Sequence, residues 1–176
     1  MTSHQLAQLN IALPIEPLTS PRLAGFVAAL DEINALADAA PGFVWRLQTE
    51  DGDATAVRAF DDDRLIVNMS VWTSLDALAD YAYRSGHVRV LRRRKEWFEA
   101  MGEAYQVLWW VPAGQLPTMA DAEQRLTHLR THGPTEYAFT FRTPFPAPAG
   151  AAPASAAPAS AAPAAPTAQD DWFCPA

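Results

Sequence analysis

The sequence predicts one α+β domain, and three observations support this fold class. Segments that alternate between apolar and polar residues, as strands do, are separated by segments whose apolar residues recur at helical spacing. Two of the predicted strands follow one another without a helix between them. Residues 144–169 are almost entirely Ala and Pro, which blocks helix formation and leaves little apolar area to bury. We therefore predict a domain over residues 1–143 and a disordered Ala/Pro-rich tail over residues 144–176.

The first strand is predicted over residues 5–13, where apolar residues alternate with Gln8 and Asn10. A Ser-Pro pair at 20–21 then provides an N-cap followed by proline at the first helical position. Apolar residues at helical spacing continue until a Pro-Gly pair at 41–42, which ends the predicted helix.

The third strand, over residues 64–72, follows a second strand at 43–48 and has the most informative pattern of the chain. One of its faces is apolar. The other face carries Ile66, Asn68, Ser70 and Trp72. A strand face in bulk water usually carries charges, whereas neutral amides and hydroxyls cost less to remove from water. The pattern therefore predicts a small, partly enclosed cavity.

Two helices and a fourth strand complete a β-α-β-β-α-β order. Thr73 and Asp76 have the spacing of a capping box and predict a helix over about 74–84. After a Ser-Gly break, a second helix is predicted from His87 to about Ala100, and a strand follows at 105–111. A second capping box predicts an appended helix over 118–132, before a short strand at 137–141.

This order predicts the ferredoxin-like split βαβ arrangement. In that fold the helices cover one face of the sheet. We expect the opposite face to carry the polar residues Gln8, Asn10, Asn68, Ser70 and Trp72. A homodimer in which two sheets face each other, a dimeric α+β barrel, would cover that face and turn it into the lining of a cavity. The appended helix is the alternative cover.

Composition excludes several classes of function. The net charge of −7 argues against a nucleic-acid partner. The basic cluster at 92–95 is interpreted as the solvated face of a helix, with an anion or acidic-partner site as the alternative. A lone cysteine, Cys174, permits no intrachain disulfide. With no signal-like or membrane-spanning run, we expect a cytoplasmic protein and no membrane partner.

Several segments together resemble a known bacterial family. They are 6–10, 42–47, 71–74, 87–98 and 108–114. Over residues 5–145 the chain resembles the family described as domain of unknown function 3291 (DUF3291). That family is similar to the dimeric α+β barrel superfamily, which includes antibiotic-biosynthesis monooxygenases and haem-degrading monooxygenases. The resemblance implies the ferredoxin-like fold and the dimer, and it brings no established reaction.

The haem-degrading branch uses a strand asparagine, a helical tryptophan and an iron-ligating histidine. By this resemblance Asn10 matches the asparagine, but Tyr81 stands at the tryptophan position. His87 arrives about one helical turn early. These departures argue against a haem-degrading role. No motif in the sequence implies a cofactor, so its identity is left open, with haem as one alternative.

The candidate site residues follow from these patterns. His87 shares a helix side with Leu91, which predicts an inward-facing imidazole able to act as acid, base or ligand, with local capping or packing as the alternative. Asn10, Asn68 and Ser70 are predicted to orient a substrate, or else to satisfy one another. The aromatic residues Trp72, Tyr81 and Trp97 are candidates to wall a flat ligand, although such residues commonly form core.

No metal site is predicted, because the His128 and His132 pair lacks the glutamate of the zinc-protease pattern. Phosphate loops and nucleophile elbows are also missing from the sequence. The preferred hypothesis is a small-molecule-binding protein with monooxygenase-like activity on a small hydrophobic or aromatic substrate. The alternative is a non-catalytic ligand-binding or structural homodimer.

Overall fold

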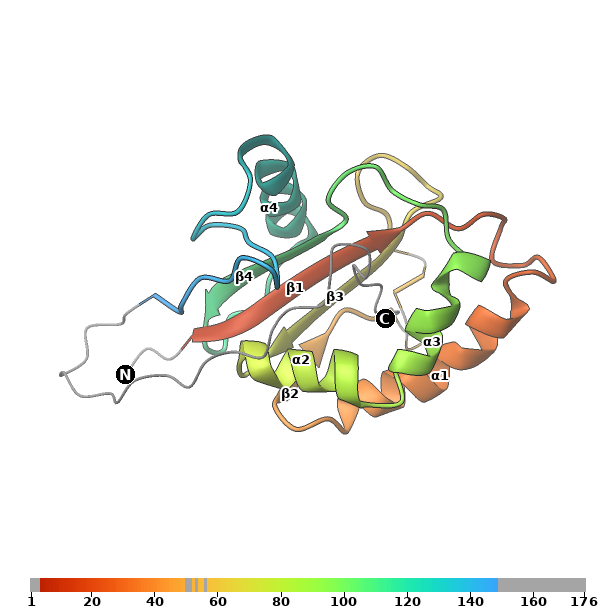
Figure 1. Cartoon of the computed structure of the whole chain (residues 1–176), viewed down its shortest axis with the longest axis horizontal. Coiled ribbons are helices and arrows are strands. Elements are labelled where there is room, and N and C mark those ends of the chain that lie inside the picture. The colour runs from red at the N-terminus through yellow and green to blue at the C-terminus, as the bar shows by residue number, and fades with distance from the viewer. Residues whose placement is uncertain (1–3, 50–51, 53, 56, 149–176) are drawn as a thin grey trace.

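The computed structural model describes residues 4–49, 52, 54–55 and 57–148. Its sheet has four strands: β1 (His4–Ala12), β2 (Phe43–Arg46), β3 (Ile66–Trp72) and β4 (Gln106–Pro112). They lie in the order β2-β3-β1-β4, and every neighbouring pair is antiparallel (Figure 1). This is the strand order of the ferredoxin-like fold, which confirms the predicted fold class. Residues 149–176, which include most of the predicted tail and Cys174, lie outside the described residues.

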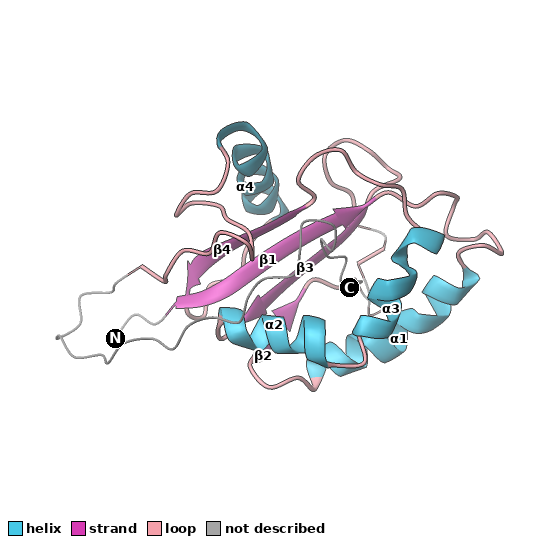
Figure 2. Ribbon diagram, viewed as in Figure 1, coloured by secondary structure: helices cyan, strands magenta, loops and turns pink. Residues whose placement is uncertain are grey.

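Helices lie on both sides of this sheet (Figure 2). They are α1 (Ala24–Asp38), α2 (Leu75–Arg84), α3 (Val88–Arg93) with a 3-10 turn η1 (Arg94–Glu96), and α4 (Met119–His132). The helices α1, α2 and α3 form one layer, and α4 lies alone across the opposite face (Figure 1). Within the described part of the chain, no helix is both long enough and apolar enough to cross a membrane.

The structure confirms one of the predicted helix starts and shifts two others. The capping box that opens α4 is confirmed, with Thr118 as the N-cap and Asp121 as its partner. The N-cap of α2 is Ser74 rather than Thr73, since the Ser74 hydroxyl accepts from the Ala77 N–H at 3.1 Å. The predicted start of the first helix, at residues 20–21, is too early, because residues 20–23 form a turn before α1 begins.

The predicted helix at 87–100 is shorter than expected. It ends after η1 because the chain then pairs with the segment that follows β1. The Ile15 N–H donates to the Trp97 carbonyl at 3.0 Å, and the Glu99 N–H donates to the Leu13 carbonyl at 2.9 Å. The predicted fifth strand is reduced to two isolated bridges, one between Leu108 and Phe139 and one between Thr135 and Ala138.

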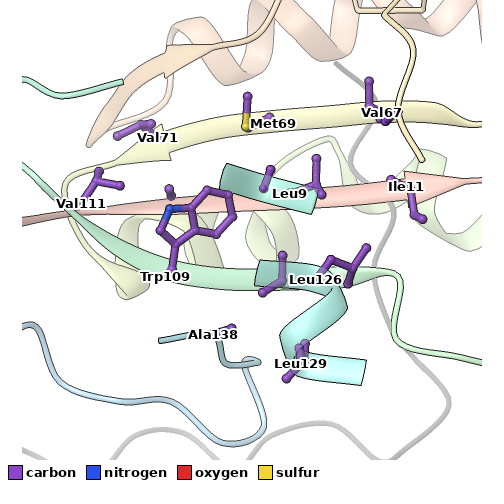
Figure 3. Close-up of a cluster of buried hydrophobic side chains, with 14 of the residues drawn as sticks. Leu9, Ile11, Val67, Met69, Val71, Trp109, Val111, Leu126, Leu129 and Ala138 are labelled. Carbon is purple, nitrogen blue, oxygen red and sulfur yellow. The ribbon is translucent and has the colours of Figure 1, made fainter. Parts of the chain in front are cut away.

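The apolar face of the sheet packs against α4 (Figure 3). Its buried residues from the strands are Ala7, Leu9, Ile11, Val67, Met69, Val71, Val107, Trp109 and Val111. Leu126 and Leu129 of α4 complete this cluster from the opposite side. The face that was predicted to pack on the main helix layer is thus covered by the appended helix.

The polar face lies under α1, α2 and α3, and our prediction that it faces away from those helices is wrong. Its neighbours in the same strands, Ile66 and Trp72, belong to clusters that contain Phe26 of α1 and Leu78 of α2. Gln8 and Asn10 are fully buried within one chain. The expectation that these neutral groups lie out of bulk water is confirmed. The cover, however, comes from the chain's own helices.

Candidate functional site

A stripe of neutral side chains crosses three strands beneath the helix layer. Asn10 of β1 lies opposite both Asn68 of β3 and Gln106 of β4. In the next row Gln8 lies opposite Ser70. Because directly opposed residues of antiparallel strands project to the same face, these five residues form one surface, which we call the polar stripe.

Hydrogen bonds join the central members of the polar stripe. The Gln8 Nε2 donates to Asn68 Oδ1 at 2.7 Å and to Ser70 Oγ at 3.1 Å. The indole Nε1 of Trp72 donates to the same Ser70 Oγ at 2.8 Å. Gln8 Oε1 is buried and has no hydrogen-bond partner among the described residues. A buried acceptor without a donor costs about 1–3 kcal/mol, which makes it a position where a ligand hydroxyl would be stabilised.

A second such acceptor lies in the layer above. Asn34 is buried on α1, and its Oδ1 has no partner in the part of the chain that the structure describes. Both the sheet and α1 therefore contribute a buried acceptor without a partner among the described residues. Native structures leave few buried polar groups unpaired, and those that remain call for a specific explanation.

Three aromatic rings extend the stripe toward α2 and α3. Trp72 stacks on Tyr81 of α2, with ring centroids 5.0 Å apart and planes 26° apart. Tyr81 in turn lies 5.0 Å from the ring of His87, and its hydroxyl donates to the Ile33 carbonyl at 3.2 Å. The order Trp72, Tyr81, His87 connects the polar stripe to the break between the two helices.

The tautomer of His87 follows from its surroundings. The imidazole is fully buried, and its Nδ1 lies 3.2 Å from the Ala82 carbonyl oxygen. Since a carbonyl oxygen only accepts, the proton must reside on Nδ1, which leaves Nε2 as the basic nitrogen of the neutral ring. Tyr81 stands between this ring and Trp72 in the stack.

An open pocket of about 360 Å³ ends at the edge of the polar stripe. Gln106, the member of the stripe on β4, contributes to its wall. The remaining lining comes from residues 101–105 and 140–142. Phe141 packs edge-on against Tyr83 of α2, so this pocket opens beside the helix layer. Its volume lies at the small end of the range for small-molecule sites.

The structure brings most of the predicted site residues together. Its connected group contains Asn10, Asn68, Ser70, Trp72, Tyr81 and His87. Trp97 lies elsewhere, packed against Phe26 at 5.8 Å in a separate cluster. It has no contact with the aromatic stack among the described ring contacts, so its role as a ligand wall is not supported.

Sequence reasoning missed Gln106, because one glutamine beside an aromatic run gives no periodic signal. Its strand register with Asn10 is the only indication, and the sequence does not provide that register. Arg46 of β2 pairs with Asp38 of α1, with Nε and Oδ1 2.9 Å apart. The described residues contain no group of three or more potential metal ligands.

The contact of His87 Nδ1 with the Ala82 carbonyl leaves Nε2 as the nitrogen that would bind a haem iron. His87 is fully buried, however, its ring packs on Tyr81, and it is not among the residues that line the pocket beside Gln106.

Comparison with known families decides the classification. The family model described as domain of unknown function (DUF3291) matches residues 5–155. The chain belongs to the DUF3291 family. The match extends past the predicted domain boundary at residue 143 and includes part of the Ala/Pro-rich segment. No curated protein matches this DUF3291 protein.

Three solved structures are similar to the DUF3291 protein at low identity. SnoaB, a cofactor-independent oxygenase from Streptomyces nogalater, is 19% identical with a TM-score of 0.42, covering 64% of this chain and 95% of that chain. NE2512, a protein of unknown function from Nitrosomonas europaea, is 12% identical with a TM-score of 0.42, covering 67% and 99%. PA3566 from Pseudomonas aeruginosa is 14% identical with a TM-score of 0.41, covering 66% and 99%.

Proposed function

We propose that the protein binds a small, flat molecule with a hydroxyl or enol group between the sheet and the helix layer, and that it oxygenates this molecule. The observation that carries the proposal is the buried acceptor Gln8 Oε1, which lies within a stripe that a pocket reaches at Gln106. A ligand hydroxyl donating to Gln8 would satisfy this group. The indole of Trp72 would provide a flat apolar surface beside it.

Neutral amides suit a reaction in which negative charge develops on oxygen. In this proposal the amide N–H groups of Asn10 and Asn68 would donate to an enolate or phenolate, and they would need no counter-charge in the buried layer. An enolate is electron-rich enough to react with dioxygen directly. In the balanced reaction, one activated methylene group and one dioxygen molecule give one ketone carbonyl and one water. The substrate supplies all four electrons.

The aromatic stack has two roles in this proposal. Tyr81, anchored to the Ile33 carbonyl, fixes the plane of Trp72 and thereby the orientation of the ligand. His87 carries its proton on Nδ1, so its Nε2 is able to accept the proton that leaves the substrate. Its position behind Tyr81 means that this transfer would require a relay. We keep His87 as the candidate base because its Nε2 carries no proton in the neutral ring.

The alternative function is a non-catalytic binding protein. It is favoured by the mutual hydrogen bonds of Gln8, Asn68 and Ser70, which already satisfy part of the stripe. A binding protein and an enzyme would use the same pocket. They differ only in whether the bound ligand is consumed together with oxygen.

Anthrone provides a direct test, because it is flat, enolises and carries one activated methylene. Oxygen uptake and the appearance of anthraquinone should be measured with the full chain, with Asn68→Ala and with the exposed control Gln48→Ala. We expect turnover by the full chain and the control, and a loss of about tenfold or more in the Asn68 variant. Binding without turnover would support the non-catalytic alternative. Absence of both binding and turnover would refute the site.

A pH profile distinguishes the two roles of His87. If it is the base, His87→Gln should lower kcat and remove the acidic limb of the rate profile while leaving anthrone affinity nearly unchanged. If it only supports Tyr81 and Trp72, the affinity should fall and the shape of the profile should remain.

A further inference from the structure

A second pocket shares Met101 and Tyr105 with the first and lies against the end of β1, at Ile11 and Ala12. Its volume is about 320 Å³. The lining residues are Ile11, Ala12, Arg94, Lys95, Phe98, Glu99, Ala100, Met101 and Tyr105. Most of these side chains are apolar, and the two cations both belong to η1.

Residues 100–104 form an arch over this pocket, and the structure fixes the arch at both ends. The Glu99 N–H donates to the Leu13 carbonyl, and the Ile11 N–H donates to the Tyr105 carbonyl, each at 2.9 Å. From α4, Arg130 Nε donates to the Ala104 carbonyl at 2.7 Å. The arch is therefore held by two main-chain hydrogen bonds and by one side chain of α4.

The cations of this pocket differ from most others in the protein. Within the described part of the chain, eight arginines form ion pairs with carboxylates within 4.0 Å. Arg94 and Lys95 are in none of these pairs. Arg94 instead donates to the Tyr105 hydroxyl at 2.8 Å, and its guanidinium lies 5.9 Å from the centre of that ring. In a chain of net charge −7, two neighbouring cations that lack a carboxylate and share an apolar pocket indicate an anionic ligand.

The lining also contains one carboxylate, Glu99. The pKa of the Arg64 guanidinium is raised mainly by its hydrogen bond with Asp62 and, more weakly, by the charge of Glu99.

We propose that this pocket binds a monocarboxylate with an apolar body, the carboxylate meeting Arg94 and Lys95 and the body lying against Ile11, Phe98 and Met101. The hydrogen bond to Tyr105 holds the Arg94 guanidinium in place, so less side-chain entropy is lost on binding. Met101 suits the apolar part because its thioether adapts to ligands of different shape. This site is distinct from the polar stripe, and the inference does not rest on the proposed oxygenation.

Octanoate and its neutral analogue octanamide are the probes, with binding measured by isothermal titration calorimetry on the full chain. We expect octanoate to bind at least tenfold more tightly than octanamide, and Arg94→Met to remove about tenfold of that affinity. Lys95→Met should have a smaller effect. The matched control is Arg92→Met, an exposed cation of α3 that does not line the pocket. It should bind octanoate as the unmodified chain does.

A second variant keeps the proposal testable if the Arg94→Met protein does not fold. Ala100 is exposed and lines the pocket, so Ala100→Phe should fill the space with no buried group disturbed, and octanoate binding should be lost. Equal affinity for the two probes, equal loss in the Arg92 control, or unchanged binding in the Ala100 variant would each overturn the proposal. Asn68→Ala should leave octanoate binding intact. A failure of the proposed oxygenation is therefore distinguishable from a failure of the proposed carboxylate pocket.

Discussion

At the scale of single residues, the polar stripe shows how neutral side chains are accommodated in a buried layer. Gln8 donates two hydrogen bonds from one nitrogen, to Asn68 and to Ser70, while Ser70 also accepts from Trp72. Each bond offsets a desolvation cost that would otherwise be of order 1–3 kcal/mol per group. Stability and ligand binding therefore depend on the same few amides.

Replacing Gln8 should be costly even though the new side chain is apolar. Gln8→Leu removes the donor of two buried hydrogen bonds and leaves acceptors on Asn68 and Ser70 with fewer partners. We expect a loss of about 1–3 kcal/mol in the free energy of unfolding, measured by urea denaturation. Gln48→Leu makes the same change at an exposed position and should stay within about 0.5 kcal/mol of the unmodified chain.

Gly42 is a second residue whose replacement should destabilise the fold. It has a φ of +83°, and a Cβ there would lie 2.5 Å from the Cβ of Ala77, in the first turn of α2. Gly42→Ala should therefore cost well over 1 kcal/mol, through backbone strain and a clash with α2. Gly114→Ala is the matched control, since its φ is +86° and nothing lies within 4 Å of its Cβ position. If the two variants unfold at the same urea concentration, the clash contributes nothing.

At the scale of elements, the helix signals in the sequence were reliable where two side chains act together. The pair Thr118 and Asp121 opens α4 because each side chain caps the backbone of the other residue. The similar spacing of Thr73 and Asp76 was misleading, since the next residue, Ser74, provides the cap. Spacing alone does not identify which of two adjacent hydroxyl residues has the extended backbone of an N-cap.

The start of α4 should respond to acid. Hydrogen bonds from the Thr118 hydroxyl and backbone N–H hold the pKa of the Asp121 carboxyl below its ordinary value of 3.8. A lowered folded-state pKa stabilises the protein above the unfolded-state value. This stabilisation decreases as the pH falls through the folded-state pKa. Asp121→Asn should therefore be less stable than the unmodified chain near neutral pH.

The test is the difference between the two urea midpoints as the pH is lowered. The difference should narrow below about pH 4, as the Asp121 carboxylate of the unmodified chain becomes protonated. Asp31→Asn, an exposed change within α1, serves as the control. A difference that stays constant with pH would contradict the role given to Asp121.

At the scale of the whole molecule, one chain covers both faces of its own sheet. The strand pattern correctly grouped the residues of each face. It did not reveal which group lies under α1, α2 and α3. The right-handed crossover of a βαβ unit determines the side that the helices occupy, but not whether odd or even residues point there. The dimer stays a prediction, although the uncovered polar face that motivated it does not exist in the structure.

The appended helix should be essential for keeping the apolar face out of water. Leu126 of α4 is fully buried against that face, so Leu126→Asp should cost about 3–5 kcal/mol and loosen the helix. We expect self-association through the uncovered sheet, measured by light scattering after size-exclusion chromatography. Thr127→Asp, at the adjacent exposed position, should elute as the unmodified chain does.

The candidate site was predictable in its chemistry and only partly in its geometry. Asn68, Ser70 and Trp72 were found because they alternate within one strand, which is a local signal. Gln106 and the cationic pocket were not found, because they depend on strand register and on the path of the chain after η1. Contacts between residues far apart in sequence leave no periodic trace in any one segment.

The bond from Arg130 to the Ala104 carbonyl joins α4 to the arch above the second pocket. A ligand held under that arch would therefore make the opening of α4 less frequent, since it would stabilise the segment to which Arg130 of α4 is bonded. Amide hydrogens in the last turns of α4 should then exchange with deuterium more slowly when octanoate is present. Slower exchange there would identify the appended helix as a reporter of occupancy in a pocket to which it contributes no lining residue.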